Sequence, residues 1–268
     1  MPKFLITGTS SGLGRYLLEE LRGTPFRRAD IENELESHRQ KYYDAIIHCA
    51  VDGRQIIPAN ELWAYHRSNI ELTKKLTEIP HGLFVFTSSC AVYPDPFREN
   101  SETDIPNFPE TNPPPQHIYY LYGLFKLLAE QIVSRNTKRS LILRCVSMIG
   151  RTGRLNNVIK VLRNDPGPLT LSPDSSFNLV SMDQIKRFIE LALTQNITGI
   201  FNTSATQNAT LEEIARAVGS RPTFGNFTYN VPRLNTDKIR GVSRDFDKNS
   251  IEIAVETAND FKRKGAKL

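Results

Sequence analysis

Short apolar runs alternate along the chain with longer segments in which apolar residues recur at helical spacing. Continuous apolar runs of this length, bounded by turn residues, are typical of buried strands. They lie at residues 3–7, 44–51, 83–89, 141–150 and 199–204. The helical spacing predicts helices over residues 15–23, 60–79, 117–135, 182–195 and 210–219. This alternation predicts an α/β fold, in which a doubly wound parallel sheet is covered by helices on both faces.

The regular pattern is interrupted in two places. Residues 94–116 contain seven prolines and no periodicity, and a loop of that length is usually functional or disordered. From about residue 204 onward the pattern breaks into short pieces, which predicts a small second lobe. We therefore expect a main domain over residues 1–150, with 177–206 returning to it. The small C-terminal lobe would comprise residues 151–176 and 207–268.

The composition is that of an ordinary globular protein, with 39% hydrophobic and 24% charged residues among 268. No apolar run approaches the roughly 20 residues needed to span a bilayer, and the N-terminus lacks a signal-peptide pattern. Cys49, Cys90 and Cys145 are far apart, which indicates reduced thiols, no metal site and a cytoplasmic protein. The final residues 266–268 read AKL, close to the SKL-type peroxisomal address, which is the alternative location.

The net charge of +5 favours an anionic ligand. The basic residues are scattered, however, and no Lys/Arg run is interleaved with aromatic residues. Since nucleic-acid binding needs a basic stripe, we do not expect a nucleic-acid partner.

A glycine cluster follows the first apolar run, where a strand would turn into a helix. Gly8, Gly12 and Gly14 give the spacing GxxxGxG, which differs from the GxGxxG of the usual Rossmann fingerprint. A turn of this kind allows close backbone approach to a pyrophosphate at a helix N-terminus. The cluster predicts a Rossmann-like dinucleotide-binding turn, and the alternative is a glycine-rich turn without a ligand. The expected cofactor contacts here are Gly8, Thr9, Ser10, Ser11, Gly12, Leu13 and Gly14.

The segment IYYLYGLFK (118–126) places three tyrosines beside one lysine. Only Tyr122 has a lysine, Lys126, four residues downstream, whereas Tyr119 and Tyr120 precede Gly123 and Leu124. Positions i and i+4 of a helix share a face, and a phenol beside an ammonium group ionises more easily. The pair predicts acid/base chemistry at Tyr122, although this spacing alone is common.

Several motifs together resemble the extended short-chain dehydrogenase/reductase family. In chain order they read TGTSSGLG, HCAV, SNIELT with Asn69, SSCAVY, YGLFK and LRCVSMIG, followed by FNLVSMDQI and IFNTS. The resemblance covers nearly the whole chain. It is closest to the NAD-dependent epimerase/dehydratase group, which works mostly on nucleotide sugars.

The resemblance implies roles for four residues. Tyr122 would be the catalytic acid/base, and Lys126 would favour its ionised form and hold the nicotinamide ribose. Ser89 would hydrogen-bond the reacting oxygen, and Asn69 would support the lysine, often through water. A hydride would pass between the nicotinamide and a sugar carbon. The structural alternatives are a strand-end cap for Ser89 and a surface helix position for Asn69.

The chain also departs from the family pattern around the expected serine. Cys90 and Ala91 stand where 4,6-dehydratases carry an Asp-Glu pair, so dehydration is not expected. Some epimerases place a proton-shuttling cysteine two residues after the serine, and here that position is Ala91. We interpret Cys90 as a small buried thiol, with proton shuttling as the alternative. Further departures that put substrate contacts in doubt are Ser11, Tyr93-Pro94, Arg144-Cys145 and Ser147.

Cofactor choice depends on the short segment TPFRRADI (24–31). Asp30 lies at the distance expected of the acid that binds the ribose 2′-OH and selects NAD. Asp30 and Ile31 also match the later family position that contacts adenine. In that interpretation Arg27 and Arg28 could clamp a 2′-phosphate, which favours NADP(H) and leaves NAD(H) possible. A third alternative is that both arginines are merely solvated. Further expected cofactor contacts are Cys49, Ala50, Tyr122 and Lys126.

The small lobe would bind the substrate. Arg233 in VPRLNTDK resembles the family arginine that meets a nucleotide diphosphate, while Asn157 and Lys160 are candidates that could equally be surface residues. The other expected substrate contacts are Ser89 and Cys90.

We expect an NADPH-dependent reductase of a keto-deoxy nucleotide sugar. The first alternative is an NAD-retaining nucleotide-sugar 4-epimerase. The second is a non-catalytic NAD(P)-sensing protein, which the complete Ser89, Tyr122 and Lys126 set disfavours. A homodimer is possible.

Overall fold

The computed structural model describes residues 2–27, 30–54, 56–93, 95, 98–104 and 120–263, except the side chain of Tyr120. The chain forms two compact units. The first comprises Met1–Pro94, Ile105–Arg144 and Phe188–Phe201, and the second comprises Asp95–Asp104, Cys145–Arg187 and Asn202–Leu268. Which unit binds cofactor and which binds substrate stays a prediction.

Within the described residues, the central sheet has six strands in the order β10-β6-β4-β3-β1-β2. They are β1 (Phe4–Thr7), β2 (Thr24–Pro25), β3 (Tyr43–His48), β4 (His81–Ser89), β6 (Ser140–Cys145) and β10 (Gly199–Thr203). The pairs of β1 with β2, β1 with β3 and β3 with β4 are parallel. The predicted α/β fold with a parallel central sheet is confirmed.

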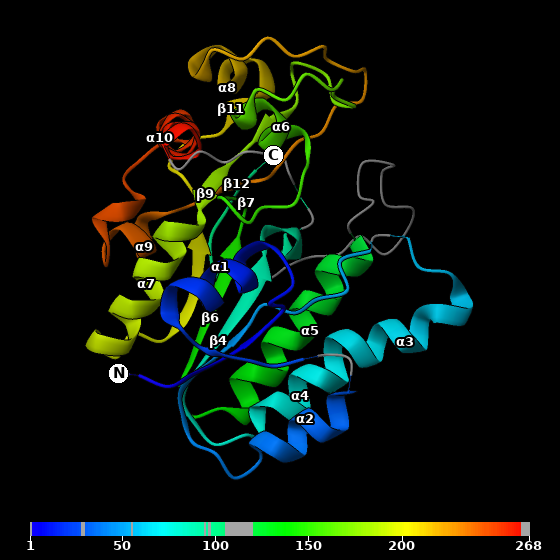
Figure 1. Ribbon diagram of the computed structural model, residues 1–268, viewed down its shortest axis with the longest axis vertical. Helices are drawn as coiled ribbons and strands as arrows, with labels where there is room; N and C mark the ends of the chain where they lie inside the picture. Colours follow the sequence, from blue (N-terminus) through cyan, green and yellow to red (C-terminus); the bar gives the residue numbers. More distant parts are fainter. Residues whose placement is uncertain are drawn as a thin grey trace. The chain divides into compact units, whose positions relative to one another are not determined.

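Helices cover both faces of the sheet in the first unit. The helices α2 (Ile31–His38), α4 (Leu72–Thr77) and α5 (Tyr120–Asn136) lie on one face, and α1 (Gly12–Leu21) lies on the other (Figure 1). Alternate strand residues such as Leu5, Ile46 and Phe84 point into one core cluster with Leu76 of α4 and Val133 of α5. The alternation follows from the two-residue repeat of a strand, so the apolar runs supply both faces of the sheet.

The predicted helix over 60–79 forms but is not uniform. It begins with the 3₁₀ turn η2 (Ala59–Glu61), continues as α3 (Leu62–His66), and passes through a π-helical turn, η3 (Arg67–Glu71), into α4. A π turn of this kind is rare and is frequently found at functional sites.

The predicted strand over 141–150 is wrong as a single strand. β6 ends at Cys145, and Ser147–Ile149 forms a separate strand, β7, which pairs in parallel with β9 (Leu179–Ser181) in the second unit. The apolar run continues past Cys145, but the backbone pairs with a different strand. The N–H of Ser147 donates to the carbonyl oxygen of Asn178, next to β9. Periodicity alone carries no sign of this change.

The second unit consists of short strands and helices. In the part of it that the structure describes, two-stranded sheets pair β11 with β8, β12 with β5 and β7 with β9. The remaining strands are β5 (Glu99–Asn100), β8 (Ser176–Phe177), β11 (Ala209–Thr210) and β12 (Arg233–Leu234). The helices are α6 (Asn157–Arg163), α8 (Leu211–Val218), α9 (Asp237–Arg240), the 3₁₀ turn η5 (Arg244–Phe246) and α10 (Ser250–Arg263), while α7 (Met182–Gln195) spans the unit boundary.

Within the described part of the chain, no helix has both the length and the apolar character to cross a membrane.

Candidate active site

The turn between β1 and α1 packs backbone directly against backbone. Gly8 has a φ of 72°, a region that favours glycine, and a Cβ there would lie 2.8 Å from the backbone nitrogen of Ala50. A Cβ at Gly14 would overlap the carbonyl oxygen of Gly8. Gly12 begins α1, and a Cβ built there would meet nothing within 4 Å. Packing therefore explains the glycines at 8 and 14. At Gly12 a φ of 61° favours glycine, and the space at the helix start is open.

The other predicted cofactor contacts lie along this turn and in the first turn of α1. Thr9 and Ser10 lie between Gly8 and the helix, Ser11 is its N-cap, and Leu13 is buried on its inner face. The first turn of α1 carries no acidic residue. The backbone N–H groups of a first helical turn and the positive end of the helix dipole make such a start suited to a phosphate group.

Helix α5 brings Tyr122 and Lys126 onto the same face. The Nζ atom of Lys126 lies 5.9 Å from the centroid of the Tyr122 ring and 4.7 Å above the ring of Phe86. Lys126 is buried, and its Nζ donates a hydrogen bond of 2.6 Å to the carbonyl oxygen of Thr87 in β4. The structure thus places a buried cation beside the phenol that the sequence singled out.

Ser89 is the last residue of β4, next to the helix that carries Tyr122. Its Oγ accepts a hydrogen bond of 3.1 Å from the backbone N–H of Ala91, so it caps the short 3₁₀ turn η4 (Cys90–Val92). A Cβ at Gly123 would overlap the carbonyl oxygen of Ala91 in this turn. The glycine therefore permits α5 to approach the turn that follows Ser89, which the sequence reasoning did not anticipate.

Asn69 is buried within the π-helical turn, so the surface interpretation of this residue is wrong. Its Oδ1 accepts from the backbone N–H of Asp52 at 3.0 Å, and its Nδ2 donates to the carbonyl oxygens of Asp52 and Tyr65. Asn69 and Lys126 line one small cavity of about 10 Å³, about the volume that one water molecule requires. The full lining is Ala50, Val51, Tyr65, Asn69, Thr73, Phe86, Tyr122, Phe125, Lys126 and Ala129.

The hydroxyl of Tyr65 is a further polar group at this cavity. The side chain is fully buried, and its oxygen has no hydrogen-bond partner among the described residues. Burial, reinforced by the negative charge of Asp52, raises the pKa of Tyr65 to about 12. Tyr65 therefore remains a neutral phenol beside Tyr122 and is not a second acid/base at neutral pH.

A buried ion pair links α5 to β6 one helical turn beyond Lys126. Glu130 and Arg144 are both almost fully buried, and the carboxylate accepts from Nε and from a terminal nitrogen of Arg144 at 2.8 Å. Ser88, next to Ser89, donates its hydroxyl to the same carboxylate, and Arg144 donates to the hydroxyl of Tyr93 at 2.7 Å. Burial opposes the charged form of Arg144, but the hydrogen bonds and charge of Glu130 and Tyr93 outweigh it and raise its pKa.

Cys90 follows Ser89 and is buried. Burial raises the pKa of this thiol to about 12, against a smaller opposing effect of a hydrogen bond from Ser89. The thiol is therefore protonated at neutral pH, which supports the interpretation of Cys90 as a packed side chain.

We expect the substitution Cys90→Ser to preserve most of the activity, because the change is nearly isosteric and the buried, protonated thiol does not act as a base at neutral pH. The measurement is the turnover rate of the folded variant with an identified substrate. A loss beyond about 100-fold, with the protein still folded, would instead assign acid/base chemistry to Cys90.

The residues that would select the cofactor lie around the start of α2. Asp30 caps this helix, since its Oδ1 accepts from the backbone N–H of Asn33, and Ile31 is the first helical residue. Arg27 is exposed just after β2, while Arg28 lies outside the described residues. Cys49 and Ala50 directly follow β3 and lie against Gly8. The capping bond gives Asp30 a structural role that does not require a ribose.

The three candidate substrate residues of the second unit show different contacts. Asn157 begins α6 and hydrogen-bonds Thr170 through both side-chain atoms, and Lys160 donates to the carbonyl oxygen of Pro168. Both are thereby engaged in joining α6 to a neighbouring segment. Arg233 is exposed on β12, and its carbonyl oxygen accepts from Asn100 of β5.

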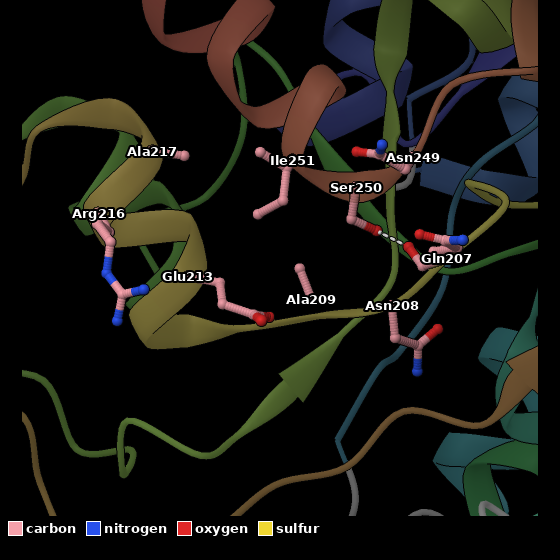
Figure 2. A pocket seen from close by; sticks show the side chains of 9 residues that line it. All are labelled: Gln207, Asn208, Ala209, Glu213, Arg216, Ala217, Asn249, Ser250 and Ile251. Atoms are coloured by element: carbon pink, nitrogen blue, oxygen red, sulfur yellow. Dashed lines mark hydrogen bonds between the residues drawn. The ribbon is translucent and has the colours of Figure 1, made fainter.

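The second unit has a hollow of about 320 Å³ between α8 and the start of α10 (Figure 2). Several of its polar groups are already used by the fold. The carboxylate of Glu213 accepts from the N–H of Thr210 in a capping box, Asn249 caps Glu252 at the start of α10, and Ser250 donates to the carbonyl oxygen of Gln207. We therefore do not place the active site there.

Comparison with solved structures gives matches over almost the whole chain. The structure of MoeE5 in complex with UDP-glucose and NAD matches with a TM-score of 0.78 at 17% identity, covering 99% of this chain and 100% of that one. UDP-glucuronic acid 4-epimerase from Bacillus cereus in complex with NAD gives 0.74 at 18%, covering 99% and 100%. A dTDP-4-dehydrorhamnose reductase from Clostridium acetobutylicum gives 0.74 at 17%, covering 97% and 99%. At these identities the likeness shows the fold.

No curated protein matches the sequence. The family model described as NAD dependent epimerase/dehydratase family matches residues 4–165. This match spans more than half of the chain, including the glycine turn, Asn69, Ser89 and the Tyr122–Lys126 pair. The chain therefore belongs to the NAD-dependent epimerase/dehydratase family.

Proposed function

We propose that the protein is an NADPH-dependent reductase of a keto-deoxy nucleotide sugar. The observation that carries the proposal is the pairing of the Tyr122 phenol with the buried ammonium of Lys126. The protonated thiol of Cys90 and the neutral phenol of Tyr65 leave Tyr122 as the candidate acid/base at this position. A ketone reductase requires one proton donor, and this arrangement supplies one.

The turn between β1 and α1 would be the cofactor site. Backbone atoms occupy the space that a Cβ would need at Gly8 and Gly14, whereas the corresponding space at Gly12, at the start of α1, is open. The Gly12–Gly14 backbone of this turn would hold the pyrophosphate, and Lys126 would hold the nicotinamide ribose. When bound, the nicotinamide supplies the hydride to the carbonyl carbon of the substrate.

The residues of this chain would handle the proton. Tyr122 donates its phenolic proton to the carbonyl oxygen, which becomes the product hydroxyl, and takes a proton back from solvent. Ser89 donates a hydrogen bond to the same oxygen, and the charge of Lys126 stabilises the transient phenolate. One ketone, one NADPH and one proton are converted into one alcohol and NADP⁺.

The substrate class is supported by the solved relatives, since the structures of MoeE5 and the 4-epimerase contain UDP-sugars. The exposed guanidinium of Arg233 suits bidentate binding of a diphosphate. Asn157 and Lys160 are weaker candidates, because their side chains already bond within the second unit.

The test is an assay of the purified protein with NADPH and a panel of keto-deoxy nucleotide sugars. Oxidation of NADPH is followed by absorbance, and the reduced sugar is identified by NMR. Failure of every sugar to oxidise NADPH would contradict the reductase proposal.

The second candidate is an NAD-retaining 4-epimerase, favoured by the NAD bound in the solved MoeE5 and 4-epimerase structures. An epimerase should carry cofactor through purification, because it regenerates the cofactor in each cycle. A reductase should be purified without it, because it exchanges the cofactor every turnover. Chromatography of the nucleotide released by denaturing the purified protein separates the two.

We expect NADPH to bind more tightly than NADH, and the double substitution Arg27→Ala/Arg28→Ala to weaken NADPH alone. A charge-assisted contact to the 2′-phosphate is worth about 1.5–3 kcal/mol, or roughly 10- to 150-fold in affinity. Calorimetry with both cofactors measures the effect, and added salt should reduce the difference. Preference of the unmodified protein for NADH would identify Asp30 as the ribose-binding acid and favour the epimerase.

A further inference from the structure

A buried histidine at the end of β3 joins two other elements of the first unit. His48 is 1% exposed. Its Nδ1 lies 2.8 Å from the hydroxyl of Thr7, the last residue of β1, and its Nε2 lies 3.0 Å from the hydroxyl of Thr73 in α4. Neither the catalytic proposal nor the glycine turn uses this residue.

The direction of each hydrogen bond follows from counting donors and acceptors. The hydroxyl oxygen of Thr7 accepts from the backbone N–H groups of Cys49 at 3.1 Å and Ala50 at 2.9 Å. A hydroxyl accepts two hydrogen bonds and donates one, so Thr7 gives its own hydrogen to Nδ1 of His48. A ring that accepts at Nδ1 is neutral and carries its hydrogen on Nε2.

The same counting continues on the other side of the ring. Nε2 of His48 donates to the hydroxyl oxygen of Thr73. The hydrogen of that hydroxyl is donated to the carbonyl oxygen of Asn69 at 2.7 Å. The side chain of Asn69 in turn accepts from the N–H of Asp52 and donates to its carbonyl oxygen.

These hydrogen bonds form a closed network around one short backbone segment, Cys49–Asp52. Its first two N–H groups are held by Thr7, and its last residue is held by Asn69. His48 and Thr73 connect Thr7 to Asn69 through hydrogen bonds. The segment also lies against the glycine turn, since a Cβ at Gly8 would be 2.8 Å from the nitrogen of Ala50.

We infer that His48 is a positioning residue for the dinucleotide: as a neutral imidazole protonated on Nε2, it fixes the Cys49–Asp52 backbone against the glycine turn. The inference rests on the proposed function only in taking this turn as the cofactor site. The competing view is a buried histidine whose hydrogen bonds stabilise the core and have no effect on cofactor affinity.

The first experiment is nitrogen-15 NMR of the histidine rings in the protein of 268 residues. The chain has five histidines, and the difference between the unmodified protein and His48→Phe assigns the signals of His48. We expect one neutral ring with its hydrogen on Nε2. An imidazole protonated on Nδ1, or one that averages between tautomers, would contradict the proposed hydrogen-bond network.

The second experiment compares two identical substitutions on α4. Thr73→Val preserves the side-chain shape and breaks the link between His48 and Asn69. Thr77→Val is the matched control: Thr77 is also buried, but its hydroxyl donates to the carbonyl oxygen of Lys74 in the same helix. We expect calorimetry to show dinucleotide binding weakened about tenfold by Thr73→Val and unchanged by Thr77→Val.

The possible outcomes separate this inference from the proposed function. If the unmodified protein binds NADPH or NADH and Thr73→Val binds it equally well, the positioning role is overturned and the proposed function stands. If the unmodified protein binds neither dinucleotide, the proposed function and the affinity effect both fail, while the NMR experiment still decides the hydrogen-bond directions. Should His48→Phe not fold, resonance differences in Thr73→Val assign the ring signals instead.

Discussion

The substitution Tyr122→Phe should abolish turnover while leaving cofactor affinity nearly intact. The phenol is the proposed proton donor, and losing a positioned acid/base costs on the order of 10²–10⁴ in rate. The ring itself remains, so the packing around Lys126 and Phe86 is preserved. The measurement is kcat on an identified substrate, with calorimetry for the cofactor.

Three other tyrosines provide matched controls for this substitution. Tyr119→Phe and Tyr120→Phe should be close to silent, because neither residue has a lysine four positions downstream. Tyr65→Phe removes a buried hydroxyl without a hydrogen-bond partner among the described residues and should also preserve turnover. A wild-type rate for Tyr122→Phe would show that the family mechanism does not operate in this protein.

The substitution Arg144→Met should produce the largest loss of stability. It leaves the carboxylate of Glu130, which is 1% exposed, without its cation. Breaking a buried pair by removing one partner costs about 3–5 kcal/mol, because an uncompensated charge stays in the core. Urea unfolding can be followed by the fluorescence of Trp63, the single tryptophan of the chain, which belongs to the same unit.

Two further variants test the cause of that loss. Arg15→Met is the exposed counterpart in the same unit, since the Arg15 side chain is 57% exposed where it pairs with Glu19, and we expect a cost below about 1 kcal/mol. The double variant Glu130→Leu/Arg144→Met should recover most of the stability, because apolar replacement of a whole buried pair is often neutral. Equal losses for Arg144→Met and Arg15→Met would refute the assignment of the effect to burial.

The sequence predicted the elements whose physical cause is local. The apolar run at 83–89 lies in β4, and residues 44–48 of the run at 44–51 lie in β3, because a strand covered on both faces must be continuously apolar. Tyr122 and Lys126 share a face, because the helical period is a local property of the chain. Gly8 and Gly14 meet in one turn because they are close together in the sequence.

The contacts that the sequence did not predict join residues far apart in the chain. Glu130 meets Arg144 and Ser88, and His48 bridges Thr7 and Thr73, only because parallel strands bring their ends together. A charged residue within the apolar segment LLAEQIV is the one local sign of the buried pair. The preference between NADP and NAD depends on side chains around residues 27–30 and stays a prediction.

The π-helical turn at Arg67–Glu71 has a consequence for aligning this chain with distant relatives. A π turn contains one residue more than an α-helical turn, and each residue of an α-helix advances about 100° around the axis. An alignment or design template that treats Leu62–Thr77 as one regular helix would be out of register by one residue on one side of the turn. It would rotate Asn69 away from Asp52 or Thr73 away from His48. At identities near 17%, a gap placed at this turn preserves both contacts.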